Sequence, residues 1–156
     1  MFKLDNEAAL LDAFRPKDRK LVQLTPEVRL PQFVRNYLSW KHPGGTYVYL
    51  VFATPGGAPT GIVFDSNSGS GPAVPAMCDW CHLSSSGSTV GLLTARRNAK
   101  KSVGVHVCSD LGCQQRLEEE ADRQGISVLP WWEKLIERMG RFASESLDID
   151  LSGAGR

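Results

Sequence analysis

The pattern of apolar and polar residues predicts helices toward both ends of the chain and strands between them. Apolar side chains recur at helical spacing over residues 6–15, and Pro16 then ends the predicted helix. Residues 25–27 (TPE) have the features of a helix start, with proline at the first helical position, but Pro31 permits at most a turn there. Aromatic residues at intervals of three and four over residues 32–40 predict another helical turn or two.

The middle of the chain reads as strands. Residues 47–53 (YVYLVFA) are almost all β-branched or aromatic, which predicts a strand buried on both faces. A Pro/Gly turn over residues 54–59 precedes a return strand at 61–64, so the two are expected to pair as a hairpin. Two further strands are expected at 89–95 and 103–107.

The C-terminal part is expected to be helical. Residues 113–124 form a polar–apolar pattern that ends at Gly125, a typical helix terminator. A last helix is predicted over residues 130–143, opened by a proline and apolar along one face. Residues 147–156 are polar and end in glycines, so we expect a frayed or disordered tail.

These elements predict an α+β fold, with an antiparallel sheet and flanking helices. The chain has 156 residues, a length typical of one domain, which we place at 1–146. A Ser/Gly/Pro-rich linker divides it into a scaffold part (1–71) and a second module (72–125) that contains all the cysteines.

The cysteines carry the strongest chemical signal. Cys78 and Cys81 form a C-x2-C pair, and Cys108 and Cys113 form a C-x4-C pair. Two short-range pairs can deliver four thiolates to one tetrahedral ion without a large loop-closure cost. The expected arrangement is that of a treble clef. The C-x2-C pair forms a knuckle, a hairpin follows it, Cys108 ends a strand and Cys113 begins a helix. Four thiolates leave no open position, which is typical of a structural Zn²⁺ site.

Other interpretations of the cysteines remain open. A redox C-x2-C would be expected at a helix N-terminus, whereas Cys81 precedes a Ser/Gly loop. His82 or His106 could replace one thiolate, the ion could be ferrous iron, or the thiols could be unrelated. A treble clef can also contain a nuclease site, but the chain has three histidines and no H-E-x-x-H or phosphate-loop motif. We therefore expect no catalytic residues.

Composition places few limits on partners. The net charge is +1, so any nucleic-acid or membrane contact must come from a local cluster. The charged N-terminal residues do not resemble a secretory leader, and no apolar run is long enough to span a bilayer. We expect a cytoplasmic protein with reduced thiols, no membrane contact and no small-molecule substrate; reduced thiols in pairs favour metal over disulfide.

The residues around the cysteines resemble a known family. Residues 78–82 (CDWCH), 90–97 (VGLLTARR) and 103–113 (VGVHVCSDLGC) are similar to the treble-clef domain of elongation factor G-binding proteins. This is the family of the fusidic acid resistance proteins of the FusB type, and its members carry an FBP domain. The resemblance implies that the four cysteines bind zinc.

The resemblance also implies a non-enzymatic function. Such proteins bind elongation factor G through the zinc domain and help it to leave a stalled ribosome. The resistance proteins have a separate N-terminal helical bundle, and the segment before Tyr47 is too short for one. We therefore expect a zinc domain on its own, which places antibiotic protection in question more than factor binding.

Two features are candidate contact surfaces. Trp80 lies between the knuckle ligands and either points outward as an anchor or packs over the metal site. The hairpin loop 96–101 contains the densest basic cluster, which could meet an acidic protein face or RNA phosphates, or simply protect a hairpin tip. An alternative function is thus a zinc-dependent RNA- or ribosome-binding module that uses the loop. The cluster consists of Arg96, Arg97, Lys100 and Lys101.

Overall fold

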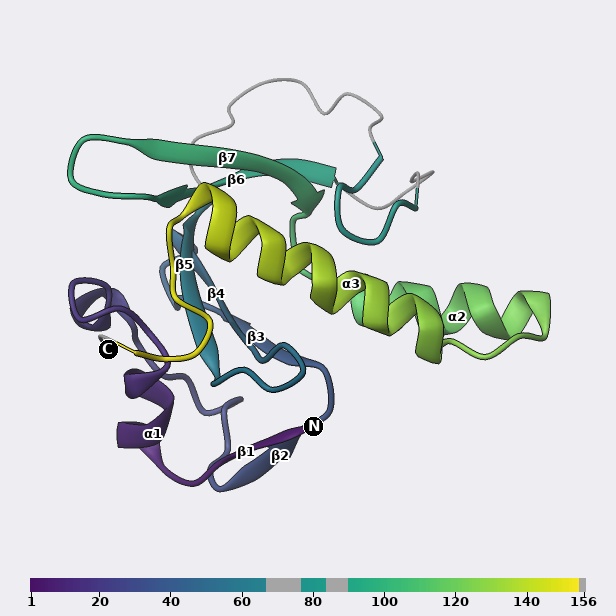
Figure 1. The fold of residues 1–156 in the computed structure, drawn as a ribbon, viewed down its shortest axis with the longest axis horizontal. Coiled ribbons are helices and arrows are strands. Elements are labelled where there is room, and N and C mark those ends of the chain that lie inside the picture. Colours follow the sequence, from purple (N-terminus) through teal and green to yellow (C-terminus); the bar gives the residue numbers. More distant parts are fainter. Residues whose placement is uncertain (67–76, 84–89, 155–156) are drawn as a thin grey trace.

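The computed structural model describes residues 1–66, 77–83 and 90–154. Its elements (Figure 1) are, in order, β1 (Phe2–Leu4), α1 (Glu7–Asp12), the 3-10 helix η1 (Arg19–Leu21), β2 (Gln32–Val34), β3 (Tyr37–Lys41), β4 (Tyr47–Phe52), β5 (Thr60–Asp65), β6 (Val90–Arg96), β7 (Ser102–Cys108), α2 (Cys113–Gln124), α3 (Leu129–Arg141) and the π-helical turn η2 (Phe142–Ser146). Antiparallel sheets and flanking helices confirm the predicted α+β class. None of the helices in these ranges is long and apolar enough to cross a bilayer.

The main sheet has five antiparallel strands in the order β3-β4-β5-β6-β7, and β1 pairs with β2 in a separate ribbon. The predicted β4–β5 hairpin is present, with Phe52 opposite Thr60. The second hairpin, β6–β7, is paired along its whole length. Among the described residues, Asp65 and Thr94 are the one pair between β5 and β6. This pair places the scaffold and the cysteine-bearing hairpin in one sheet.

Both faces of β4 are buried, as the sequence predicts. Val48, Leu50 and Phe52 face a core that also contains the cysteines and α3. Tyr49 and Val51 face a second core, built from the N-terminal segment. Figure 1 shows that segment (purple) and the C-terminal helices (green to yellow) on different sides of β3–β5.

The helices next to the cysteines agree with the sequence. α2 covers the predicted range, and Gly125 ends it with a left-handed φ of 67°. α3 begins one residue earlier than predicted and has Pro130 in its first turn. Its buried face packs into the core that contains the cysteines. The first helix is shorter than predicted and starts after Asn6, whose side chain accepts a hydrogen bond from the amide of Ala9.

Of the two N-terminal segments predicted as helical turns, the first is confirmed as a single turn and the second is wrong. Residues 25–27 form a turn that is not continued as a helix, with the Val28 amide donating to the Thr25 carbonyl. Residues 32–40 form β2 and most of β3 instead of a helix. Tyr37 and Trp40 lie in different cores, because residues three apart in a strand point to opposite faces.

The predicted frayed tail is also wrong for residues 147–154. Leu147 and Ile149 are buried in the core beside α3. The Leu151 carbonyl accepts a hydrogen bond from the Ala58 amide, so the segment is tied to the β4–β5 turn. The polar composition concealed these apolar anchors. Most of the predicted Ser/Gly linker and the turn at 84–88 lie outside the described residues.

Candidate metal centre

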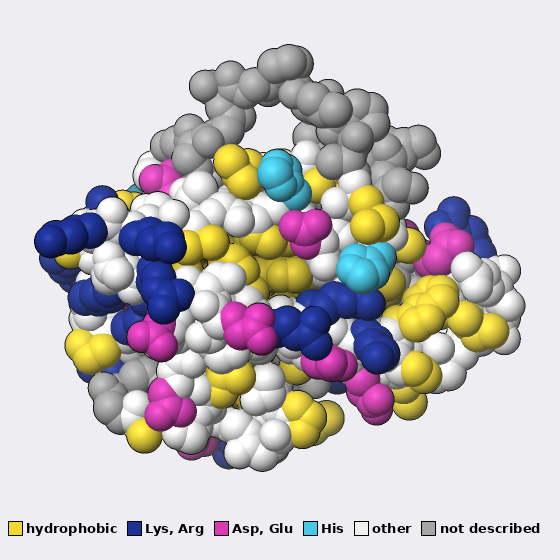
Figure 2. Space-filling view, turned by 45° about the horizontal axis from the view of Figure 1, so that its top comes forward, with side chains coloured by type: hydrophobic (Ala, Val, Ile, Leu, Met, Phe, Trp, Pro, Cys, Tyr) yellow, Lys and Arg dark blue, Asp and Glu magenta, His cyan; other side chains and the backbone are white. Residues whose placement is uncertain are grey.

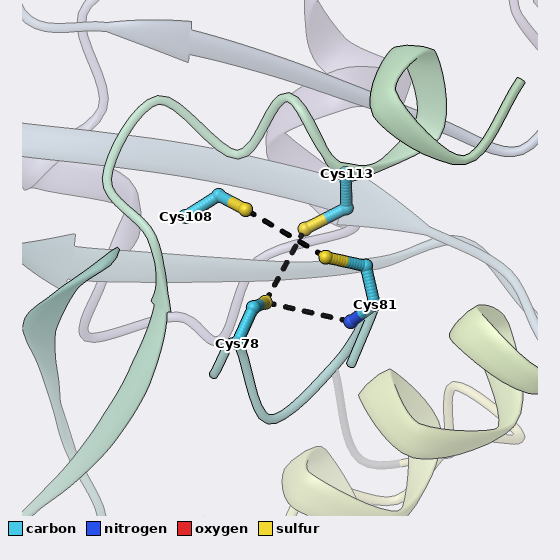
Figure 3. A group of neighbouring side chains, drawn as sticks. All are labelled: Cys78, Cys81, Cys108 and Cys113. Atoms are coloured by element: carbon cyan, nitrogen blue, oxygen red, sulfur yellow. Dashed lines mark hydrogen bonds between the residues drawn. The ribbon is translucent and has the colours of Figure 1, made fainter. Parts of the chain in front are cut away.

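The four cysteines converge in the structure (Figure 3). Their sulfur atoms all lie within 4.8 Å of one another, and all four residues are buried. The Sγ atoms of Cys78 and Cys113 are 3.7 Å apart, and those of Cys81 and Cys108 are 3.8 Å apart. A tetrahedron with Zn–S bonds of about 2.3 Å has edges of about 3.8 Å. A disulfide would need about 2.05 Å, so the distances fit one shared ion and not two bridges.

A tight turn positions the first pair. The Cys81 amide donates to the Cys78 sulfur at 3.4 Å, which directs main-chain polarity at a ligand. The His82 amide donates to the Cys78 carbonyl, and His82 adopts a left-handed φ of 60°. The Asp79 amide donates to the His106 carbonyl of β7 at 2.8 Å. The knuckle is therefore attached to the hairpin that supplies the third cysteine.

The second pair lies at the two ends of a short loop. Cys108 is the last residue of β7, and Cys113 is the first residue of α2. Asp110 accepts from the Gly112 amide and from both terminal nitrogens of Arg116, each at 2.9 Å. The Arg116 guanidinium, through these hydrogen bonds, lowers the pKa of the Asp110 carboxyl. This clamp fixes the turn that leads from strand to helix.

The scaffold also holds this loop. The Tyr37 hydroxyl donates to the Leu111 carbonyl and accepts from the Gln114 amide, the latter at 2.9 Å. The indole of Trp132 donates to the Gln114 carbonyl at 3.1 Å. The start of α2 is therefore bound both by β3 and by α3. Sequence reasoning missed all three contacts, since the partners are far apart along the chain.

Hydrogen bonds among the four thiols hold the pKa of Cys78 and Cys81 below the ordinary thiol value and raise the pKa of Cys108 and Cys113 above it. The close packing of the four sulfur atoms therefore lets only some of the thiols ionise unaided. A buried thiolate needs a compensating positive charge, which a divalent cation supplies. No histidine belongs to the cluster among the residues that the structure describes. His82 and His106 are both exposed, so the geometry favours four thiolates over a mixed cysteine–histidine set.

The comparison with protein families agrees with this geometry. The model of the FBP C-terminal treble-clef zinc-finger matches residues 8–145. The chain belongs to this family. No curated protein matches the chain. The FBP-type zinc finger and the four close cysteines together identify the cofactor as Zn²⁺. The redox interpretation fits less well, because neither knuckle cysteine lies at a helix N-terminus.

Trp80 of this FBP-type domain is not an outward-facing anchor. It is only 2% exposed, and its ring lies against Phe64 and Phe142 with centroids 5.8 and 5.9 Å apart. Arg138 of α3 donates to the Trp80 carbonyl at 2.7 Å. The prediction that Trp80 binds a partner is therefore corrected, and the residue joins the knuckle to α3. The sequence signal for this packing role is the position of Trp80, a large apolar residue between two metal ligands that are themselves buried.

The predicted basic loop lies at the far end of the β6–β7 hairpin. Arg96, Lys100 and Lys101 are exposed, whereas Arg97 is partly buried. Arg97 donates to the main-chain carbonyls of Glu145 and Ser146, so its guanidinium anchors the hairpin to η2. The four cations thus have different roles, and whether they bind a partner remains a prediction.

Proposed function

We propose that this chain is a non-enzymatic zinc-binding protein that binds elongation factor G and promotes its release from the ribosome. The observation that carries the proposal is the match of the FBP treble-clef family to residues 8–145, with the cysteine motifs that resemble factor-binding proteins. Membership in a zinc-finger family favours a binding module over an enzyme. The zinc ion then stabilises the surface that meets the factor.

The geometry of the metal centre supports binding over catalysis. Four buried sulfur atoms leave a tetrahedral ion no position for water or substrate. A site of this kind contributes folding energy and fixes the relative positions of the chain segments around it. Here those segments are the knuckle, the β6–β7 hairpin and α2.

A hollow beside the knuckle is our candidate surface for a protein partner. It has a volume of about 320 Å³ and lies between the knuckle, α2 and α3. Its lining combines apolar side chains with charged ones: Leu83, Leu117 and Trp131 with Glu120, Lys134 and Arg138. Figure 2 shows hydrophobic side chains gathered toward this end, beside a histidine and basic side chains. An apolar centre with a charged rim is typical of protein interfaces.

The binding test uses purified, nuclease-treated elongation factor G and the zinc-loaded chain in biolayer interferometry. We expect binding that resists nuclease and falls at least tenfold in Trp131→Ala, because tryptophan side chains dominate interface energies. Phe33→Ala is the matched control, since Phe33 is 68% exposed on β2, outside the hollow. No binding by the unaltered chain would contradict the proposal.

Release from the ribosome is tested separately. Ribosomes stalled with fluorescent elongation factor G and fusidic acid are mixed with the chain, and the dissociation rate of the factor is followed. We expect elongation factor G to dissociate from the ribosome faster as the concentration of the chain increases. The Trp131→Ala variant should accelerate this dissociation only slightly. A rate that does not change at saturating chain would restrict the function to binding.

A further inference from the structure

The tip of the β6–β7 hairpin has an exposed cationic surface that combines two distant segments. Arg96, Lys100 and Lys101 lie at the tip, and Lys17 joins them by donating to the Arg97 carbonyl at 3.3 Å. Among the described residues, none of these four side chains forms an ion pair. Figure 2 shows the basic side chains gathered at this end of the molecule. We call these four residues the basic tip.

Hydrogen bonds from two arginine side chains hold the basic tip in place. Arg15 donates to the carbonyls of Arg96 and Arg97, and its guanidinium is also paired with Asp18 at 2.8 Å. The side chains of Arg15 and Asp18 are 12% and 7% exposed. Arg97 in turn bonds the carbonyls of η2. Arg15 and Arg97 thus fix the main chain of the hairpin end, and the four side chains of the basic tip remain exposed to solvent.

The turn between the strands is ordered as well. The Arg97 amide donates to the Lys101 carbonyl at 2.9 Å, and the Lys100 amide donates to the Asn98 side chain at 2.9 Å. A fixed turn loses little conformational entropy when it binds a ligand. Bringing like charges together is unfavourable in the absence of an anion, which is consistent with a binding surface.

The composition of the basic tip favours phosphate over protein. Exposed large hydrophobic side chains occur among the described residues at Met1, Phe33, Met77, Ile126 and Leu129, none of them in the tip. Protein interfaces have an apolar or aromatic centre and are depleted in lysine, whereas phosphate contacts need only cations. We propose that the basic tip binds the phosphate backbone of duplex RNA. The choice of RNA rests on the function proposed above, which places the chain beside ribosomal RNA.

Recognition by this surface is independent of sequence. Reading unpaired bases requires aromatic side chains on which the bases stack, and the basic tip contains none. Affinity therefore comes from the release of counterions and depends steeply on salt. The seven-residue strands of the hairpin separate the tip from the cysteines by about 20 Å. RNA at the tip and a protein at the knuckle can bind at the same time.

The test titrates a fluorescent 20-base-pair RNA duplex of arbitrary sequence with the zinc-loaded chain between 50 and 200 mM salt. Four phosphate contacts predict a slope of log K against log salt of about −3.6, with dissociation constants of about 1–100 μM. The variant R96Q/K100Q/K101Q is expected to lose at least tenfold in affinity. K17Q alone is expected to make the slope shallower by about one unit.

The matched control is R29Q/K41Q/R123Q, which removes the same charge from exposed positions elsewhere. We expect it to bind the duplex almost as well as the unaltered chain, with all proteins checked for zinc content and circular dichroism. An equal loss of RNA affinity in the control, or no loss in R96Q/K100Q/K101Q, would overturn the proposal.

Unchanged RNA affinity with slower association to elongation factor G would assign the tip to a protein instead. Loss of RNA affinity in a chain that does not bind the factor would leave this inference standing without the proposed function.

Discussion

The hydroxyl of Tyr37 donates a hydrogen bond to the main-chain carbonyl of Leu111, and so joins β3 to the loop between Cys108 and Cys113. Burial raises the pKa of Tyr37, so the hydroxyl keeps its proton across the physiological range. The same oxygen accepts from the Gln114 amide. One side chain of the scaffold therefore fixes both the turn before α2 and the first turn of the helix.

Tyr37→Phe is expected to destabilise the protein by about 1–3 kcal/mol, because the substitution leaves the Leu111 carbonyl and the Gln114 amide without this buried partner. Zinc should also transfer faster to a chelator. Urea unfolding and a colorimetric zinc assay measure the two effects. Tyr47→Phe is the control, since Tyr47 is only partly buried, and it should change neither quantity by a comparable amount.

Removal of zinc is expected to unfold the cysteine-bearing part first. Without the ion, the four buried thiols are no longer held together, while the core built from the N-terminal segment keeps its apolar contacts. Hydrogen exchange after chelation should show lost protection in β6, β7 and α2 before β4 and β5. Cys113→Ser should reproduce the pattern and lower the metal content below one ion per chain. A thermal transition that is unaffected by verified metal loss would contradict the structural role of zinc.

The Arg15–Asp18 pair is expected to be strongly coupled. Arg15→Leu leaves the Asp18 carboxylate buried without its cation, which costs about 3 kcal/mol. The double variant Arg15→Leu/Asp18→Leu should recover part of that loss, as equilibrium denaturation would show. The exposed pair Arg141–Glu137 is the control, and Arg141→Leu should cost less than about 1 kcal/mol. Additive losses from the two single substitutions would disprove the coupling.

Gly61→Ala is expected to destabilise the scaffold by about 1–3 kcal/mol through overpacking. A Cβ atom at this position would lie 2.6 Å from the ring of Phe14, which is fully buried. The strand glycine Gly104 is the control, because its added methyl group would meet the flexible end of Leu92. Denaturation midpoints of the two variants at equal m-values test the difference. A Gly104→Ala loss as large as that of Gly61→Ala would show that strand propensity, not the Phe14 contact, sets the effect.

The metal site was predictable because its signal is local. Two close cysteine pairs, a helix start at Cys113 and a terminating glycine at Gly125 each depend on a few neighbouring residues. The hairpin of β4 and β5 was predictable for the same reason, from one apolar run and one Pro/Gly turn.

The strand at 37–41 was not predictable, because it has buried side chains on both faces. Tyr37 faces the core beside the cysteines and Trp40 faces the N-terminal core, so apolar residues do not alternate with polar ones. Their spacing of three then imitates a helix. Long-range contacts were equally hidden: no local pattern joins Tyr37 to Leu111, or Lys17 to the hairpin tip.

Asp65–Thr94 is the one pair between β5 and β6 among the described residues, and it has a consequence for protein design. The rings of Phe64, Trp80 and Phe142 pack against one another next to β5, and we expect their sizes to influence the angle between the two hairpins. Replacing these three residues with larger or smaller ones should rotate the β6–β7 hairpin relative to the β4–β5 hairpin, while the hydrogen bonds within each hairpin remain. The fold could therefore serve as a scaffold on which the orientation of a hairpin is chosen through these three side chains.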